Sequence, residues 1–304
     1  MPMFGQIFAI FIDVVAPVFA LVLIGYLVGP RLNLDARTLS RTAYFIFVPA
    51  FIFNSISTAK IELSATLQIV FYIVIVHLIV AILGFGLAKI LRRPKELVAA
   101  YVMIAVFGNT GNFGLSLIDF RLGPSSQIPA TVYFLTTLTF GFVVSVGIAR
   151  WTRGGKMAAV LSVLKTPALL ALIPALFFPI MDLEVPLMIT RLTGLMGRVM
   201  IPLMLFTLGV QMAFVSKPEF SIDMILASGI RLLAAPLVAA VVAFFLGISG
   251  VERAAGIIQS GMPVAVLISI IAIEYNILPE FVTTSVLFST LVSLLTATVV
   301  LYLV

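Results

Sequence analysis

The stretch "VFGNTGNFGLSL" (Val106–Leu117) carries the feature on which the interpretation of the whole chain depends. It lies within 22 residues, Leu97 to Ile118, that carry no charged side chain. A run this long and apolar predicts a membrane-spanning helix, because a hydrocarbon core about 30 Å thick needs about 20 apolar residues. Three glycines, two asparagines and a threonine nevertheless stand in its middle, where they weaken a helix and bring polar groups into the bilayer. The stretch therefore predicts an interrupted transmembrane segment.

The composition excludes a soluble protein. Of the 304 residues, 62% are hydrophobic and 10% are charged, and the mean hydropathy is +1.26. A soluble surface needs far more charge than this. Apolar windows of spanning length predict an all-α integral membrane protein with ten transmembrane helices, at residues 7–29, 40–58, 63–88, 97–120, 128–149, 162–180, 190–215, 222–246, 252–274 and 280–303. Cysteine is absent, which excludes disulfides and thiolate metal sites, and we expect no cofactor and no metal.

The basic residues indicate the topology. The formal net charge is +6, but the cations are dispersed among short loops, which does not suit nucleic-acid binding. Loops after odd-numbered spans hold twelve cations: Arg31, Arg37, Arg41, Lys89, Arg92, Arg93, Lys95, Arg150, Arg153, Lys156, Lys165 and Lys217. Loops after even-numbered spans hold five: Lys60, Arg121, Arg191, Arg198 and Arg253. Positively charged loops stay in the cytoplasm, so both termini are predicted to face outward.

Weak internal similarity indicates a duplication. "YFIFVPAFIF" (Tyr44–Phe53) resembles "RVMIPLMLFT" (Arg198–Thr207), with their prolines 153 residues apart. "VYFLTTL" (Val132–Leu138) resembles "VLFSTLV" (Val286–Val292) at a separation of 154. The chain is therefore predicted to consist of two five-helix repeats, residues 1–150 and 151–304. Because five is odd, the second repeat must be inverted relative to the first.

The repeat predicts a partner for the first break. "QSGMPVAV" (Gln259–Val266), in the middle of the ninth span, follows Asn109–Asn112 by about 151 residues and carries its own helix breaker. Paired broken spans are typical of transporter sites, where half-helix N-termini meet and hold an anion with main-chain N–H groups. We expect spans 4 and 9 to cross and to bind a small organic anion through Asn109, Thr110, Gly111, Asn112, Gln259, Met262, Pro263 and Val264. The alternative is that the glycines serve only close helix packing.

Several motifs in order resemble those of the auxin efflux carrier family. They are "VPAFIF" (48–53), "NTGNFGL" (109–115), "IPLMLFTLGVQ" (201–211), "RLLAAP" (231–236), "GMPVAV" (261–266) and "VLFSTLVSLLT" (286–296). The resemblance covers essentially the whole chain. It implies a fold akin to the bile-acid–sodium symporters, with spans 1, 2, 6 and 7 as a scaffold domain and spans 3–5 and 8–10 as a transport domain. It also implies elevator-type transport of organic anions, either auxin-like molecules or dicarboxylates, with Asn109 and the peptide around Pro263 as contacts.

Two departures from the family pattern limit what the resemblance implies. Ser116 stands where family members usually have proline. The identity of the substrate therefore cannot be carried over from the family to this chain. The loop Arg150–Lys165 is short, which resembles a bacterial carrier in the inner membrane rather than a plant member. A homodimer through the scaffold domain is the expected assembly in the bilayer.

Four polar side chains outside the two breaks have two interpretations each. Asn54 and Gln211 line the scaffold face of the site, or they make packing hydrogen bonds. Arg231 attracts the anion from the cytoplasmic side, or it snorkels to the membrane surface. His77, the one histidine of the chain, relays protons or is a neutral hydrogen-bonded residue.

Other functions compete with a simple anion carrier. A sodium- or proton-coupled symporter on the same architecture is the nearest alternative, although acidic residues are missing from the two breaks. An intramembrane serine protease would use Ser116 with His77, but no further motif supports an enzyme. A passive channel is the third alternative, and saturable exchange in proteoliposomes would distinguish it from a carrier.

Overall fold

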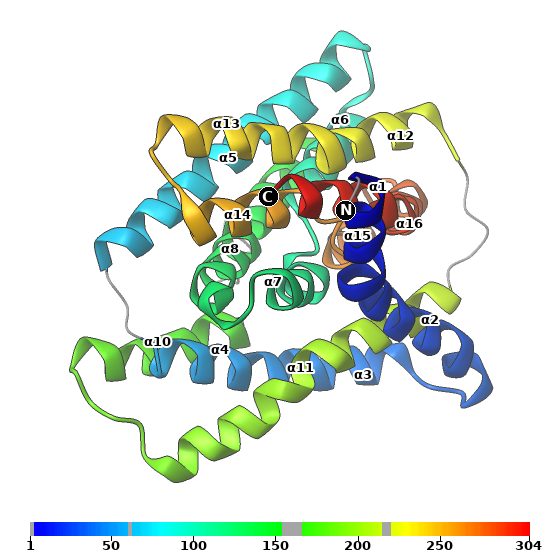
Figure 1. Ribbon diagram of the computed structural model, residues 1–304. Helices are drawn as coiled ribbons and strands as arrows, with labels where there is room; N and C mark the ends of the chain where they lie inside the picture. Colours follow the sequence, from blue (N-terminus) through cyan, green and yellow to red (C-terminus); the bar gives the residue numbers. More distant parts are fainter. Residues whose placement is uncertain (1–2, 60–62, 154–165, 215–219) are drawn as a thin grey trace.

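The computed structural model describes residues 3–59, 63–153, 166–214 and 220–304 (Figure 1). Within these residues the chain is nearly all helical, and its β pairing is a single bridge between Gly108 and Val264. The first residues of the predicted sixth span and the end of the seventh lie outside the described residues. So do four of the cations used to predict the topology, Lys60, Lys156, Lys165 and Lys217.

The helices follow one another with short connections. In chain order they are α1 (Met3–Ile10), η1 (Phe11–Val15), α2 (Ala16–Arg31), α3 (Ala36–Thr42), η2 (Ala43–Phe47), α4 (Val48–Ser57), α5 (Leu63–Ile90), α6 (Lys95–Val106), η3 (Thr110–Gly114), α7 (Leu115–Leu122), η4 (Pro124–Ser126), α8 (Gln127–Arg153), α10 (Pro167–Ile180), α11 (Leu187–Ala213), α12 (Ile222–Gly229), η6 (Ile230–Ala234), α13 (Ala235–Phe245), α14 (Gly250–Ser260), α15 (Leu267–Glu274) and α16 (Pro279–Leu303). The turns η1, η2, η3 and η6 are π-helical and η4 is a 3-10 turn.

Seven helices among the described residues are long and apolar enough to cross a membrane: Met3–Arg31, Ala36–Ser57, Thr66–Ile90, Pro124–Thr152, Leu187–Ala213, Ile222–Phe245 and Pro279–Leu303. Each coincides with a predicted span. The sixth predicted span is represented by the shorter apolar helix α10. The fourth and ninth are each divided into two shorter helices, α6 with α7 and α14 with α15. The prediction of a multi-pass helical membrane protein is thus confirmed.

One group of helices packs through glycines. Helix α11 contacts α2, α3 and α4, and α10 contacts α4; these helices lie along the lower part of the molecule in Figure 1. A Cβ atom at Gly25 of α2 would fall on the main-chain oxygen of Phe206, and one at Gly209 of α11 would fall on that of Val22. Small residues therefore let the α2 and α11 backbones approach closely, the packing that replaces the hydrophobic effect within a bilayer.

The second group surrounds the two divided segments. Helices α5, α6, α8 and α12–α16 contact one another and fill the centre and upper part of Figure 1. Tyr72 of α5 is buried and donates a hydrogen bond to the main-chain oxygen of Ala239 in α13, at 3.1 Å. Helix α1 contacts α16, which places the first helix of the chain against the last.

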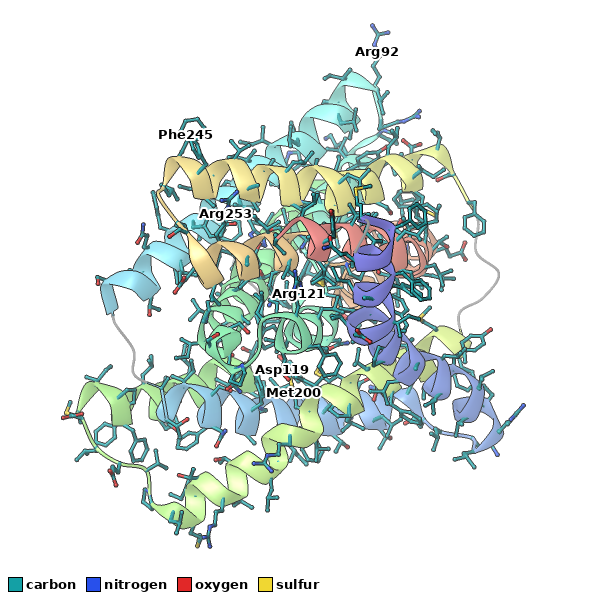
Figure 2. The ribbon with its side chains drawn as sticks, viewed as in Figure 1. Arg92, Asp119, Arg121, Met200, Phe245 and Arg253 are labelled. Carbon is teal, nitrogen blue, oxygen red and sulfur yellow. The ribbon has the colours of Figure 1, made fainter. Side chains whose placement is uncertain are left out.

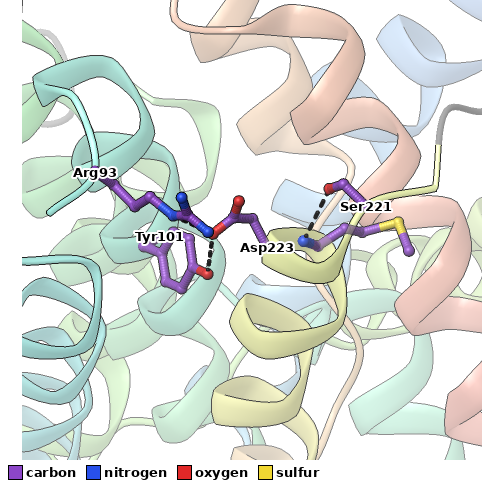
Figure 3. A network of polar contacts seen from close by, with 5 residues as sticks. Arg93, Tyr101, Ser221 and Asp223 are labelled. Carbon is purple, nitrogen blue, oxygen red and sulfur yellow. Dashed lines mark hydrogen bonds and ion pairs between the residues drawn. The ribbon is translucent and has the colours of Figure 1, made fainter. Parts of the chain in front are cut away.

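A polar network joins the turn before α6 to the first turn of α12 (Figure 3). Arg93 Nε lies 2.9 Å from Asp223 Oδ1, and the Tyr101 hydroxyl donates to the same oxygen at 2.7 Å. Ser221 caps α12 by accepting a hydrogen bond from the N–H of Met224. The negative carboxylate of Asp223 is favourable at the positive N-terminal end of α12. Through its bonds to Arg93 and Tyr101 it also ties the start of α12 to α6 and the turn before it.

Further hydrogen bonds connect helix ends that are distant in sequence. Arg121, in the last turn of α7, donates to the main-chain oxygen of Leu301 near the C-terminus at 3.0 Å, and Figure 2 shows it near the centre of the view. Gln68, near the start of α5, donates to the main-chain oxygen of Leu246 after α13, at 3.0 Å. Arg92 projects outward from the turn between α5 and α6 (Figure 2).

Candidate functional site

The two divided segments meet at their breaks. Helix α6 ends at Val106 and η3 begins at Thr110, while α14 ends at Ser260 and α15 begins at Leu267. The N–H of Asn109 donates to the carbonyl of Pro263 at 2.6 Å, and the N–H of Ala265 donates to the carbonyl of Phe107 at 2.8 Å. Unwound backbone at membrane depth must be satisfied by protein, and here each break satisfies the other. We call this antiparallel pairing of residues 107–109 with 263–265 the crossing.

Asn109 begins the second half of the first divided segment. Its side-chain oxygen accepts a hydrogen bond from the N–H of Asn112 at 3.4 Å, in the position of an N-cap. Its amide nitrogen Nδ2 is buried and has no hydrogen-bond partner in the described part of the chain. A buried donor without an acceptor costs free energy, so this amide nitrogen is a candidate hydrogen-bond donor to a ligand.

A cavity of about 340 Å³ touches both half-helix N-termini. Thr110, Gly111 and Asn112 come from the first turn after the first break, and Ala265, Val266 and Leu267 come from the start of α15. The rest of the lining consists of Ser40, Arg41, Ala43, Tyr44, Val48, Phe107, Gly108, Asn109, Phe134, Leu138, Met204, Thr207, Gln211 and Ile270. We call it the first cavity.

The charge distribution around the first cavity favours an anion. Each helix N-terminus carries roughly half a positive elementary charge, and main-chain N–H groups there bind anions readily. Arg41 is the one charged side chain among the described lining residues, and it is exposed. Most of the wall is apolar, which is usual for a small-molecule site that fixes its ligand with few polar groups.

Six of the eleven predicted site residues lie at cavities. Asn109, Thr110, Gly111, Asn112 and Gln211 line the first cavity. The Gln211 side-chain amide donates to the Ser40 hydroxyl at 2.8 Å, which joins α11 to α3 at the wall. Asn54 instead lines a second cavity, and its side-chain oxygen lies 3.5 Å from the Thr193 hydroxyl.

The side chain of Gln259 is directed away from the first cavity. Gln259 is 0% exposed, and its amide donates to the main-chain oxygen of Ala130 at 3.3 Å. A Cβ atom at Gly114 would fall on its side-chain oxygen, so the Gln259 side chain packs against the next turn of the other divided segment. The sequence pattern predicts this side chain as a ligand contact. The structure places it behind the crossing.

The other predicted residues of the second break are buried and act through their backbones. Pro263 accepts the hydrogen bond from Asn109, and Val264 donates its N–H to the Ser289 hydroxyl at 3.1 Å. Met262 accepts a hydrogen bond from Arg231. These three residues hold the crossing together, while the following turn, 265–267, reaches the first cavity.

Arg231 does not snorkel, which corrects one of its two sequence interpretations. It lies in the π-helical turn η6 and is 2% exposed. Its guanidinium donates to three main-chain carbonyls, those of Met262, Ala105 and Gln259. A snorkelling arginine would instead extend to the membrane surface.

Some residues at the first cavity were not predicted. Ala265, Val266 and Leu267 follow the proline of the second break, and the signal for them was the start of a helix just after Pro263. Ala43 and Tyr44 lie in the π-helical turn η2, which turns them toward the site. No sequence pattern marks such a turn, although π-turns occur often at functional sites.

The second cavity, of about 910 Å³, lies between α4 and α11 on one side and α7 and α8 on the other. Arg191 and Arg198, seven residues apart and therefore on one face of α11, both line it. Asp119, at the end of α7, is the one acidic residue in its described lining, and Figure 2 shows it close to α11. The second cavity therefore has an excess of positive charge.

His77 and Ser116 each bond within their own helix. His77 is 1% exposed, and its Nδ1 lies 2.8 Å from the carbonyl of Ile73. The Ser116 hydroxyl donates to the carbonyl of Asn112 at 2.6 Å. The rings of Tyr133 and Phe140 have centroids 6.0 Å from that of His77. This arrangement fits a hydrogen-bonded histidine among aromatic rings, and it does not pair the two side chains as a catalytic dyad.

Metal-ligating side chains are not clustered in the described residues. They contain no group of three or more histidine, aspartate or glutamate side chains that could hold a metal ion. The polar groups in the described lining of the first cavity are amides, hydroxyls, helix N-termini and the guanidinium of Arg41, which suit an organic anion.

Comparison with known proteins identifies relatives along the whole chain. The family described as "Membrane transport protein" matches residues 10–160 and 153–301. An "Uncharacterized transporter" of Methanothermobacter thermautotrophicus is 28% identical over 292 residues, which cover 93% of this chain and 94% of that protein. A protein of Rhizobium meliloti named "Putative malonate transporter" is 24% identical over 307 residues, which cover 95% of this chain and 94% of that protein.

Proposed function

The chain belongs to the auxin efflux carrier-like family of membrane transport proteins, and we propose that it is a secondary transporter of small organic anions that works by an elevator mechanism. As its substrate class we propose short carboxylates, dicarboxylates such as malonate first among them. The relative named for malonate supports this class, because its similarity to this chain extends over nearly the full length of both proteins.

The observation that carries the proposal is the free amide donor of Asn109. It is buried beside the crossing, at the start of a helix whose N-terminus and that of α15 both reach the first cavity. A carboxylate there would accept hydrogen bonds from the amide and from main-chain N–H groups, and it would be held by two helix dipoles without an ion pair. A neutral acceptor would gain less from those donors, because hydrogen bonds to a charged group are roughly twice as strong, and a cation would be repelled by the positive helix ends.

The elevator mechanism is supported by the way the helices group. The first group (α2, α4, α10, α11) would be the fixed scaffold, and the second group, with the crossing, would be the moving domain. Helices α4 and α11 contribute residues to both cavities. The first cavity lies at the η3 end of the divided segment η3–α7, and the second cavity lies at its α7 end. A sliding movement of the crossing along α4 and α11 would expose the ligand to one cavity and then to the other.

Ten spans with inverted halves form part of the same proposal. The hydrogen bonds between helix ends agree with it: Arg93 and Asp223 belong to ends predicted on the cytoplasmic side, and Arg121 and Leu301 to ends predicted outside. Ser40 with Gln211 pairs two further cytoplasmic ends, and they lie at the wall of the first cavity. In the proposed topology the first cavity therefore opens toward the cytoplasm and the second toward the outside.

The experiment is counterflow in proteoliposomes that contain the purified protein. Vesicles loaded with unlabelled malonate should accumulate labelled malonate, and malate and acetate added outside should compete to different extents. Saturation with concentration would separate a carrier from a channel. Protein-free vesicles and the Asn109→Ala variant are the controls. Absence of saturable exchange with mono- and dicarboxylates would contradict the proposed substrate class.

A further inference from the structure

Within the described part of the chain, no carboxylate forms an ion pair with the buried cation Arg231. Among the described residues the structure contains one ion pair, between Arg93 and Asp223, at the edge of the molecule. Arg231 lies instead in the middle of the apolar helix Ile222–Phe245 and is 2% exposed. A charge at this depth is costly unless it is fully hydrogen-bonded, so its partners define its role.

Those partners are the C-terminal ends of both half-helices. Arg231 Nη1 donates to the carbonyl of Ala105, in the last turn of α6, at 3.2 Å. Nη2 donates to the carbonyl of Gln259, in the last turn of α14, and Nε to that of Met262 just beyond it, both at 2.9 Å. One planar guanidinium thus joins the two divided segments on the side opposite to their N-termini.

The charges at the crossing are thereby divided. Two helix C-termini each carry roughly half a negative elementary charge, which together match the single positive charge of a guanidinium. The two N-termini remain for the ligand at the first cavity. An anion bound there therefore needs no additional cation to balance the helix ends.

Gly108 provides the space for this arrangement. A Cβ atom at Gly108 would fall on Nη2 of Arg231, so the guanidinium packs directly against the backbone of the crossing. Gly108 is also the residue that bridges to Val264. The close fit holds the arginine in the position of a bound ion rather than a mobile side chain.

We propose that Arg231 is a resident cation of the crossing: its guanidinium occupies the main-chain carbonyl oxygens that an exchangeable Na⁺ would need, and the anion site is assembled without a bound metal cation. In ion-coupled carriers, unwound carbonyls and half-helix C-termini coordinate the coupling ion. Here the same kind of oxygens already accept hydrogen bonds from the protein. This inference rests on the proposed function for its ligand, and Arg231 is a positioning residue in it.

The first experiment compares cations on the parent protein. Thermal unfolding in detergent and malonate affinity are measured in NaCl, KCl and choline chloride at one ionic strength. A resident cation predicts the same melting temperature and the same affinity in all three salts. A melting temperature or an affinity that rises specifically with Na⁺ would overturn the proposal, since it would show an exchangeable ion site.

The second experiment removes the guanidinium and restores it. Arg231→Ala should melt at a lower temperature than the parent and bind malonate at least about tenfold more weakly, because three hydrogen bonds from a charged group are lost. Millimolar guanidinium or Na⁺ should then raise its melting temperature and recover affinity, while the parent does not respond. Chemical rescue is a result that a purely packing role would not produce.

The matched control is Arg121→Ala, which also removes an arginine that donates to a main-chain carbonyl, that of Leu301, but away from the crossing. It should show no rescue by guanidinium and no loss of malonate affinity.

Arg231→Lys keeps the charge and should fold more readily than Arg231→Ala. It should retain part of the malonate affinity and should not respond to guanidinium. If Arg231→Ala and Arg121→Ala behave alike, the proposal is wrong. Since melting does not require the ligand, it tests Arg231 even if malonate proves not to be transported.

Discussion

The main-chain N–H of Asn109 donates a 2.6 Å hydrogen bond to the carbonyl of Pro263, which lies 154 residues further along the chain. The same interval separates the sequence segments that resemble each other in the two halves, and the two prolines of another pair are 153 residues apart. The crossing therefore pairs residues at nearly equivalent positions of the predicted repeats, and each break uses the other as its hydrogen-bonding partner.

Asn109 is expected to be the principal ligand of the anion. Asn109→Ala should weaken binding by about tenfold to a hundredfold or more, because a hydrogen bond to a charged group is worth ~1.5–3 kcal/mol. Asn109→Asp should weaken it further by placing a negative charge beside that of the substrate. Affinity on purified protein, with folding checked by thermal melting, is the measurement.

Asn54→Ala is the matched control for Asn109, because Asn54 lines the second cavity and not the first. It should cost less affinity than Asn109→Ala. If the Asn109→Asp variant bound the anion as tightly as the parent, the anion site would have to lie elsewhere and Asn109 would be a packing residue.

Gly108→Ala should destabilise the protein and weaken ligand binding together. The added Cβ would fall on the Arg231 guanidinium and force it from its three carbonyls. Overpacking of this kind costs ~1–3 kcal/mol. Thermal melting in detergent and malonate affinity measure the two effects.

Gly86→Ala, in α5, is the comparison, since a Cβ at that position would meet nothing within 4 Å. It should leave melting unchanged or raise it slightly, because glycine in a helix is less favourable than alanine by ~0.5–1 kcal/mol. If both alanine variants melted like the parent, the close fit between Gly108 and Arg231 would be refuted.

The topology predicts opposite accessibility for Ser125 and Lys95. Both are exposed, and the chain contains no cysteine, so single cysteines can be introduced without background. In intact cells a membrane-impermeant thiol reagent should label Ser125→Cys, and it should label Lys95→Cys after the cells are opened. The reverse pattern would contradict the orientation derived from the positive-inside rule.

The two arginines of the second cavity are expected to attract substrate from the outside. Replacing Arg191 and Arg198 together by glutamine should raise the KM for external malonate by about twofold to thirtyfold, because each exposed charge interaction is worth ~0.2–1 kcal/mol. The effect should diminish at high salt, where exposed charges are screened. Initial uptake rates in oriented vesicles measure it.

Arg253→Gln provides the control for that pair. Arg253 is exposed and belongs to a loop predicted on the same outer side, but it is not part of the second cavity. Its replacement should leave the KM unchanged. An equal change in KM for both variants would attribute the effect to the overall charge of the outer surface.

The sequence by itself determined the class of protein and marked the position of the candidate site. Apolar windows of spanning length fixed the multi-pass membrane fold, because each span must be long and apolar enough for the bilayer. The glycines and asparagines of 108–112 and the proline at 263 marked both breaks, since these residues are unfavourable in an apolar helix without a compensating partner. The family resemblance followed from the same motifs. The inverted relation of the two halves stays a prediction.

Only the tertiary structure decided which side chains face the ligand. Gln259 lies in the last turn of α14, just before the second break, and its amide is turned to Ala130, whereas Val266 and Leu267 reach the first cavity. The sequence left Arg231 with two interpretations, attraction of the anion or snorkelling, and the structure shows that it holds the two helix C-termini. The physical reason is that a membrane helix is apolar on all sides, so its sequence lacks the periodicity that reveals the inward face of a soluble helix. Its rotation is set by glycine contacts and buried hydrogen bonds to helices distant in the chain.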